Sequence, residues 1–299
     1  MENITLPNLY EAPLMLEKSG FSDVVCRELH IEAPEPDLTD WTAMVERIHN
    51  RSEEVHIGLV GKYVKLHDAY LSVAEAMNHA GYEENAFVKI HWIDSEGITR
   101  ETVNDVLHGL DGIIVPGGFG SRGIEGMILS AKYARENRIP YFGICLGMQI
   151  AVIEFARHVL GLTDAHSGEF DEQCAHRVID FMPGQSGEID KGGTLRLGSY
   201  PCCIKAGTKM EECYGSEQIH ERHRHRYEFN NEYRGELEKA GLVISGTSPD
   251  GRLVETIELP EHPFFIGVQF HPEFKSRPNQ PHPLFKGFIS AALKQTEEK

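Results

Sequence analysis

The stretch Ile139-Pro140-Tyr141-Phe142-Gly143-Ile144-Cys145-Leu146-Gly147-Met148-Gln149 joins an apolar, β-prone segment to a run with helical character. Gly143 and Gly147 flank Cys145, which gives the Gly-x-nucleophile-x-Gly pattern of an elbow between a strand and a helix. Glycine removes Cβ atoms that would clash in such a turn, and the following helix points its free N–H groups at the sulfur, which favours a thiolate. The alternative is a buried, unreactive cysteine in a strand.

A candidate base for this cysteine lies far downstream. Residues 263–274 read Pro-Phe-Phe-Ile-Gly-Val-Gln-Phe-His-Pro-Glu-Phe, a buried-strand pattern that ends in His271-Pro272-Glu273. A cysteine nucleophile needs a base, and the base needs a group that fixes its tautomer and stabilises its charged form. We therefore predict a catalytic triad of Cys145, His271 and Glu273. A surface or core histidine, one of sixteen in the chain, is the alternative.

A glycine-rich turn follows another expected strand. Residues 111–120 read Asp-Gly-Ile-Ile-Val-Pro-Gly-Gly-Phe-Gly. The backbone N–H groups of Gly118 in this turn and of Leu146 in the elbow are our candidates for an oxyanion hole. A tight turn that needs glycine only for its conformation is the alternative.

These three motifs together resemble the class I glutamine amidotransferases, which implies hydrolysis of glutamine to glutamate and ammonia by the triad. Within that family, several further stretches resemble the CTP synthases, and the resemblance runs over nearly the whole chain. The stretches are Gly61-Lys62-Tyr63, Asp68-Ala69-Tyr70-Leu71-Ser72, Gly192-Gly193-Thr194-Leu195-Arg196-Leu197-Gly198 and Glu221-Arg222-His223-Arg224-His225-Arg226-Tyr227-Glu228.

The resemblance also implies how L-glutamine is bound. Glu169 would bind the α-ammonium group and Arg226 the α-carboxylate, a task that suits a planar fork of donors. The complete set of implied pocket residues is Gly118, Phe119, Leu146, Gln149, Glu169 and Arg226. The family usually has Asn-Ser-Thr-Glu-Phe where this chain has residues 166–170, His-Ser-Gly-Glu-Phe, so the glutamate is kept while its neighbours differ. A solvated glutamate, a basic surface run and a core-facing helix residue are the alternatives.

The glycine-flanked stretch at residues 192–198 resembles the lid that covers the active site of CTP synthases and responds to GTP, an allosteric activator. Its lid residues would be Gly193, Arg196 and Gly198. Glycines at both ends suit a hinged loop. A plain β-hairpin is the alternative.

Composition excludes several classes of protein. The 299 residues are 40% hydrophobic and 25% charged, which is ordinary for a globular protein. A net charge of −17 argues against general binding of nucleic acid or anionic membranes. We see no signal peptide and no membrane-length apolar run. The six cysteines have no metal-binding spacing, so we expect no metal and a reducing cytoplasmic location. The family resemblance implies no cofactor for the glutaminase step.

From residue 54 onward, apolar strand-like segments alternate with helical ones. This pattern predicts an α/β domain at 51–299, with a mostly parallel central sheet, helices on both faces, and ligands at the C-terminal ends of the strands. We expect Gly81 to stop the first helix of this domain. The expected strands are residues 55–60, 88–93, 112–115, 139–144, 194–197, 242–246, 253–259 and 264–270. The expected helices are residues 69–79, 99–108, 124–135, 148–160 and 284–294.

Residues 1–50 are expected to form short helices without a strand, at 10–18, 23–29 and 41–49. By resemblance this segment is the tail of an amidoligase domain with its linker, and the rest of that domain is expected to be missing from the chain. ATP, Mg²⁺ and UTP would then be needed only together with that partner domain. The stretch at residues 58–63, Gly-Leu-Val-Gly-Lys-Tyr, lacks the spacing and the hydroxyl of a phosphate-binding loop.

Two other functions compete with this interpretation. One is a different elbow-cysteine hydrolase or protease on a similar sheet. The other is a non-enzymatic regulatory fragment that binds an assembly partner through residues 1–50.

Overall fold

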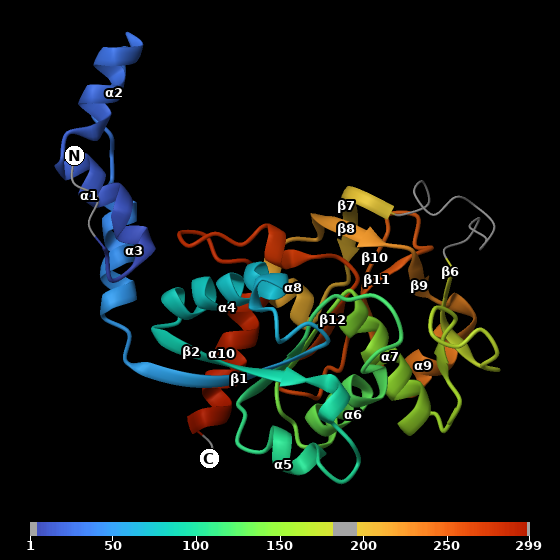
Figure 1. The fold of residues 1–299 in the computed structure, drawn as a ribbon. Coiled ribbons are helices and arrows are strands. Elements are labelled where there is room, and N and C mark those ends of the chain that lie inside the picture. Colours follow the sequence, from blue (N-terminus) through green and yellow to red (C-terminus); the bar gives the residue numbers. More distant parts are fainter. Residues whose placement is uncertain (1–4, 182–195, 298–299) are drawn as a thin grey trace.

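The computed structural model describes residues 5–181 and 196–297, and within them it shows an α/β fold (Figure 1). Its main strands are β1 (Glu53–Gly61), β2 (Ala86–Asp94), β3 (Gly112–Val115), β4 (Tyr141–Ile144), β7 (Arg196–Ile204), β8 (Gln218–His225), β10 (Val243–Thr247), β11 (Val254–Glu258) and β12 (Phe265–Val268). Its α-helices are α1 (Ala12–Lys18), α2 (Phe21–Leu29), α3 (Thr39–His49), α4 (Leu71–Glu83), α5 (Val103–Leu107), α6 (Ile124–Glu136), α7 (Leu146–His158), α8 (Lys209–Tyr214), α9 (Arg234–Lys239) and α10 (Pro283–Glu297).

Within the described part of the chain, nine strands form one sheet in the order β2-β1-β3-β4-β12-β11-β10-β7-β8. The pairs from β2 to β12 are parallel. The pairs from β12 to β8 are antiparallel. The predicted α/β fold is therefore confirmed, and its parallel half carries the elbow. The antiparallel half corresponds to the shorter β-like pieces expected in the second half of the sequence.

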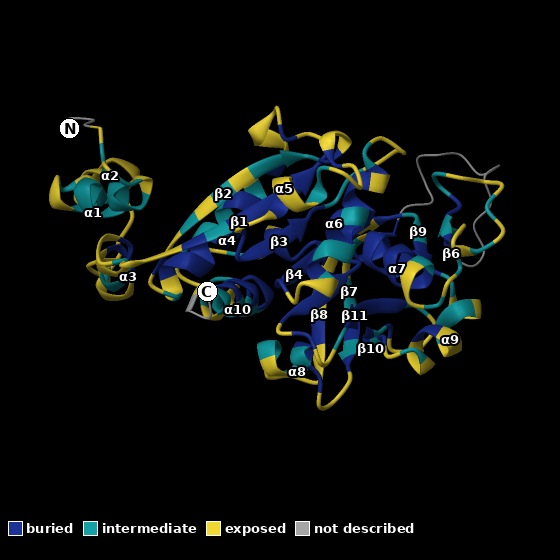
Figure 2. Ribbon diagram, turned by 90° about the horizontal axis from the view of Figure 1, so that it is seen from below, coloured by how far each residue is buried: buried dark blue, intermediate teal, exposed yellow. Residues whose placement is uncertain are grey.

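Helices cover both faces of this sheet, as predicted. The core on one face combines residues of α4, α8 and α10 with the sheet. The core on the other face combines residues of α5, α6, α7 and α9 with the sheet. Strands β3, β4 and β12 are buried along their whole length because helices cover both of their sides. Figure 2 shows β3 and β4 in the dark blue of buried residues.

The basic run before Tyr227 is a strand rather than a surface loop. Residues alternate strictly between exposed and buried along β8, so that Arg222 and Arg224 face outward while His223 and His225 face the protein. The sequence analysis did not assign a strand here, because the charged residue types hid the alternation of period two. A small second sheet of β5 (His166–Ser167), β6 (Arg177–Phe181) and β9 (Tyr227–Phe229) was also not expected.

The expectation that Gly81 stops a helix was wrong, because α4 continues through it to Glu83. A Cβ atom at position 81 would lie 2.7 Å from the carbonyl oxygen of Ala86 and 2.8 Å from Cγ2 of Val88. The glycine therefore lets α4 approach the start of β2. Its role is close packing inside the helix and not helix termination.

The N-terminal helices lie to one side of the sheet (Figure 1). No described residue of α1 or α2 is buried, whereas α3 packs Met44, Val45 and Ile48 against Tyr82 of α4. All three expected N-terminal helices are present. The division of the chain near residue 50 stays a prediction.

Hydrogen bonds also tie this segment to the rest of the protein. The hydroxyl of Tyr10 donates to Oε2 of Glu75 at 3.0 Å and lies 2.9 Å from Nε2 of His79. The other ring nitrogen of His79 lies 3.1 Å from Oγ of Ser276. Ser276 follows η5 (Pro272–Phe274), which contains the predicted triad glutamate. The hydrogen bonds from Tyr10 through His79 therefore reach the segment next to that glutamate.

Gly147 gives a direct test of the packing between α7 and the sheet. A Cβ atom at this position would lie 2.0 Å from the carbonyl oxygen of Val115, which is backbone and has no side-chain freedom to move away. We expect Gly147→Ala to lower the free energy of unfolding by about 3 kcal/mol, measured by urea denaturation. Gly235→Ala in α9, where a Cβ atom meets nothing within 4 Å, is the matched control and should leave stability unchanged or higher. Equal stability of the two variants would contradict this account.

Candidate active site

The elbow between β4 and α7 has the strained geometry that the sequence predicts. Cys145 has φ 51° and ψ −97°, a conformation that costs energy for a residue with a Cβ atom. Its backbone N–H donates to the carbonyl oxygen of Val268 at 2.7 Å. A Cβ atom at Gly143 would lie 2.5 Å from the carbonyl oxygen of Gly147, so this glycine is required where the helix doubles back over the strand.

The structure brings His271 and Glu273 to this elbow. Strand β12 pairs with β4 in parallel, so the residues that follow both strands emerge at the same edge of the sheet. Nδ1 of His271 lies 2.7 Å from Oε1 of Glu273, and a Cβ atom at Gly117 would lie 2.9 Å from Cε1 of His271 and 3.7 Å from Cβ of Cys145. All three side chains line one cavity of about 250 Å³. In this arrangement Cys145 stands as the nucleophile, His271 as the base and Glu273 as the carboxylate that orients the base.

The electrostatics of His271 follow from these contacts. Burial alone would lower the pKa of the imidazole, because it disfavours the charged form. The charge of the Cys145 thiolate and its hydrogen bond, together with the bond to Glu273, outweigh burial and raise the pKa of His271 to about 10. The imidazole is therefore held in its protonated form at neutral pH, beside the sulfur.

A second cavity, of about 150 Å³, is also lined by Cys145. All six residues that the family resemblance implied for glutamine binding line it, although they come from four separate segments of the chain. Its lining residues are Gly118, Phe119, Cys145, Leu146, Gln149, Glu169, His225, Arg226 and Tyr227.

Glu169 is half-buried and lies near the positive charges of Lys62 and Arg226. Burial raises its pKa, while a hydrogen bond from the backbone N–H of Gly120 at 3.2 Å and the charges of Lys62 and Arg226 act in the opposite direction. An acidic side chain on the wall of this cavity suits an ammonium group. The guanidinium of Arg226 on the same cavity suits a carboxylate.

Lys62 supports the glycine-rich turn, and sequence reasoning missed this role. Its Nζ donates to the carbonyl oxygen of Phe119 at 3.1 Å and also to that of Gly120. Burial lowers the pKa of Lys62 to about 8, with the charge of Glu169 acting against that shift. The available signal was the Gly61-Lys62-Tyr63 stretch, which belongs to the family resemblance and lacks the features of a phosphate-binding loop.

Gln269 was the second omission. Its Nε2 lies 3.5 Å from Sγ of Cys145, and its Oε1 lies 3.3 Å from Nε2 of Gln149. Gln149 in turn donates to the carbonyl oxygen of Tyr227 at 3.2 Å. The signal in the sequence was a polar side chain in an otherwise apolar strand segment, directly before the predicted base.

Comparison with known proteins agrees with this geometry. The family model described as "Glutamine amidotransferase class-I" matches residues 65–291, which include the elbow, the glycine-rich turn and His271-Pro272-Glu273. The chain belongs to the class I glutamine amidotransferase family. Glutamine hydrolysis that supplies ammonia is the activity of such a domain in CTP synthases.

The curated relatives of this amidotransferase are named CTP synthase. The protein of Listeria innocua is 58% identical over 95% of this chain and 54% of its own length. That of Carboxydothermus hydrogenoformans is 59% identical over 98% of this chain and 55% of its own length. The chain thus spans about half the length of the curated relatives it matches.

A solved structure is similar as well. The glutaminase domain of Trypanosoma brucei CTPS with bound acivicin superposes with a TM-score of 0.76, at 42% sequence identity, over 80% of this chain and 94% of that one. The present chain therefore corresponds to the glutaminase portion of a CTP synthase.

The predicted lid of this amidotransferase is only partly described. Gly193 lies outside the described residues, whereas Arg196 and Gly198 belong to β7. The guanidinium of Arg196 is buried and lies 2.6 Å from Oε1 of Glu255. The lid function stays a prediction.

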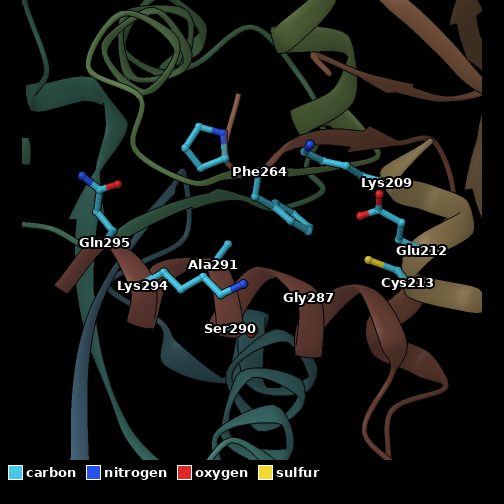
Figure 3. A pocket seen from close by; sticks show the side chains of 10 residues that line it. Lys209, Glu212, Cys213, Phe264, Gly287, Ser290, Ala291, Lys294 and Gln295 are labelled. Atoms are coloured by element: carbon cyan, nitrogen blue, oxygen red, sulfur yellow. The ribbon is translucent and has the colours of Figure 1, made fainter. Parts of the chain in front are cut away.

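A further cavity, between α8 and α10, is lined by none of the residues of the candidate active site (Figure 3). Burial raises the pKa of the Cys213 thiol that lines it to about 12, so this thiol is unsuited to nucleophilic chemistry. Nζ of Lys209, also on its wall, donates to the carbonyl oxygen of Pro260 at 2.9 Å. None of the predicted site residues lines this cavity.

Two properties concern the described residues as a set. Across 5–181 and 196–297, no three His, Cys, Asp or Glu side chains are grouped so that they could hold a metal ion. The same ranges contain no helix that is both long and apolar enough to cross a bilayer. The expected cytoplasmic location stays a prediction.

The coupling between Cys145 and His271 can be measured by titration. Cys145→Ala removes the negative charge and the hydrogen bond that favour the imidazolium, while burial of the ring remains. We expect the titration midpoint of His271, followed by NMR of the ring nitrogens, to fall by more than one pH unit from about 10 in this variant. His262, which hydrogen-bonds the Ala134 carbonyl, is an internal control whose midpoint should not move. An unchanged midpoint for His271 would show that the two side chains are not coupled.

Proposed function

We propose that Cys145, His271 and Glu273 hydrolyse the side-chain amide of L-glutamine to glutamate and ammonia. The observation that carries this proposal is the meeting of a strained elbow cysteine with an oriented, protonated imidazole beside a cavity that has an acidic and a basic wall. The family assignment supports the same chemistry.

In the first half of the reaction, the Cys145 thiolate attacks the amide carbon of glutamine and forms a carbon–sulfur bond. The amide oxygen becomes an oxyanion, which the backbone N–H groups of Gly118 and Leu146 would stabilise; both residues line the cavity beside the sulfur. His271 then gives its proton to the nitrogen, the carbon–nitrogen bond breaks, and ammonia leaves.

In the second half, the now neutral His271 removes a proton from water as the water oxygen attacks the γ-glutamyl thioester. The carbon–sulfur bond breaks, glutamate is released, and the proton taken by His271 restores the imidazolium beside the thiolate. Glu273 fixes Nδ1 of His271 as the donor toward itself, which leaves Nε2 to exchange protons with the substrate.

The cavity walls support glutamine over other amides. The Glu169 carboxylate would bind the α-ammonium group and Arg226 the α-carboxylate, with Phe119 and Gln149 lining the space between. A substrate that lacks either charged group loses the corresponding charge-assisted contact with the cavity wall, so we expect it to bind more weakly. A γ-glutamyl peptide cleaved faster than glutamine would favour the competing protease function.

We further propose that the ammonia serves CTP formation, because the curated relatives carry the name CTP synthase. In that function an amidoligase domain would use ATP, Mg²⁺ and UTP, and GTP would activate the glutaminase through the lid at Gly193, Arg196 and Gly198. Residues 1–50 would belong to the junction with the amidoligase domain.

Loss of the nucleophile tests the glutaminase proposal. We expect Cys145→Ala to lower the rate of glutamate release from glutamine by about 10⁴-fold or more, because the covalent path is removed. Cys26→Ala in α2, a substitution of the same kind outside the site, should retain full activity. If the folded, unmutated chain neither releases glutamate nor reacts at Cys145 with a glutamine-like electrophile, the non-enzymatic alternative is favoured.

Arg226 tests the substrate assignment. Arg226→Lys keeps the charge but removes the planar pair of donors, so we expect KM for glutamine to rise about tenfold or more, with a smaller change in kcat. Arg252→Lys, at an exposed arginine away from the cavity, is the matched control. A wild-type KM in Arg226→Lys would remove this residue from the carboxylate site.

A further inference from the structure

We propose that Gln269 is an additional catalytic residue, whose side-chain amide donates a hydrogen bond to the thiolate of Cys145 and fixes the direction of its lone pairs. This inference deepens the proposed glutaminase function and rests on it. The observation behind it is the 3.5 Å separation between Nε2 of Gln269 and Sγ of Cys145.

The position of Gln269 follows from the strand that precedes it. Along β12, Phe265 packs into the core beside α7, and a Cβ atom at Gly267 would lie 3.0 Å from Cα of Met148 in the same helix. Side chains alternate between the two faces of a strand, so Gln269 points toward α7 as well. The side chain is fully buried there, between Cys145 and Gln149.

A fixed acceptor determines which end of the Gln269 amide faces the sulfur. The carbonyl oxygen of Tyr227 can only accept, so the group of Gln149 that lies 3.2 Å from it must be the NH₂ group. The same NH₂ group lies 3.3 Å from Gln269, whose facing atom must then be the oxygen. This leaves the NH₂ group of Gln269 directed at the sulfur of Cys145.

Such a bond serves the chemistry in two ways. A donor to the charged form of an acid favours that form, so the amide helps to keep the sulfur ionised before attack. The Gln269 amide also gives the thiolate a donor in a fixed position, which restricts the direction of its lone pairs. Gln149, which hydrogen-bonds Gln269, also lines the glutamine cavity. The orientation of the Gln269 amide therefore depends on a residue that would contact the substrate.

Other titratable and charged groups line the two cavities that meet at Cys145, and the test leaves all of them in place. They are Tyr63, Tyr70, Glu169, Arg224, His225, Arg226, Tyr227, His271 and Glu273. Burial keeps His225 neutral among them by lowering its pKa.

The test compares Gln269→Met and Gln269→Glu in the full chain. Methionine keeps the approximate volume and removes the donor, and glutamate keeps the acceptor for Gln149 but places a carboxylate against the thiolate. The rate of Cys145 alkylation by iodoacetamide is measured against pH by mass spectrometry, together with kcat and KM for glutamine. Gln218→Met, at an exposed position of β8, is the matched control.

We expect the alkylation midpoint to rise by about one pH unit in Gln269→Met, which is a tenfold smaller thiolate fraction below the midpoint, and by more in Gln269→Glu. At neutral pH kcat should fall about tenfold while KM changes less than twofold. The control should match the unmutated chain. A folded Gln269→Met with an unmoved midpoint overturns the inference, because a purely structural role would lower only the unfolding temperature.

A second measurement covers variants that fail to fold. In Cys145→Ala, the side-chain amide protons of Gln269 lose their acceptor, so their NMR signals should shift and exchange faster with water. Unchanged signals overturn the inference. If the unmutated chain is active but the Gln269 results are negative, only this inference fails; if the unmutated chain is neither alkylated at Cys145 nor active, the proposed function fails with it.

Discussion

The hydrogen-bonded pairing of β4 with β12 is the constraint on which the site depends. In this parallel pair Gly143 lies opposite Gly267 and Ile144 lies opposite Val268, and the N–H of Cys145 extends the ladder to the carbonyl oxygen of Val268. The register decides which residues meet at the edge of the sheet. A slip by one residue would turn the side chains that follow β12 to the opposite face and separate the base from the nucleophile.

The sequence predicted the parts of the structure that rest on local pattern. The elbow, the strand that precedes His271 and the glycine-rich turn are continuous motifs whose residue types indicate their geometry. All three were placed correctly in the fold. The six pocket residues were different, because only the family resemblance selected them. Glu169 lies on a segment with no periodic pattern. The residue types next to it do not indicate that its carboxylate binds a ligand.

The omissions share a physical cause. Lys62 and Gln269 act through contacts with segments distant in sequence, which no local pattern reports. The strand β8 was missed because its buried positions hold Glu221, His223 and His225 in place of apolar residues. These polar side chains are tolerated inside because they bond one another and neighbouring groups: the facing ring nitrogens of the two histidines lie 2.8 Å apart, and burial keeps both rings neutral by lowering their pKa values.

The bond between Tyr10 and His79 has a consequence for proton placement. The single phenolic proton of Tyr10 goes to Glu75, so its oxygen must receive the proton on Nε2 of His79, and Nδ1 is left to accept the hydroxyl proton of Ser276. Burial lowers the pKa of this ring and keeps it in one neutral tautomer. The turn directly before α1 is therefore connected to the side chain of Ser276, three positions after Glu273, by a chain of hydrogen bonds in which each donor is defined.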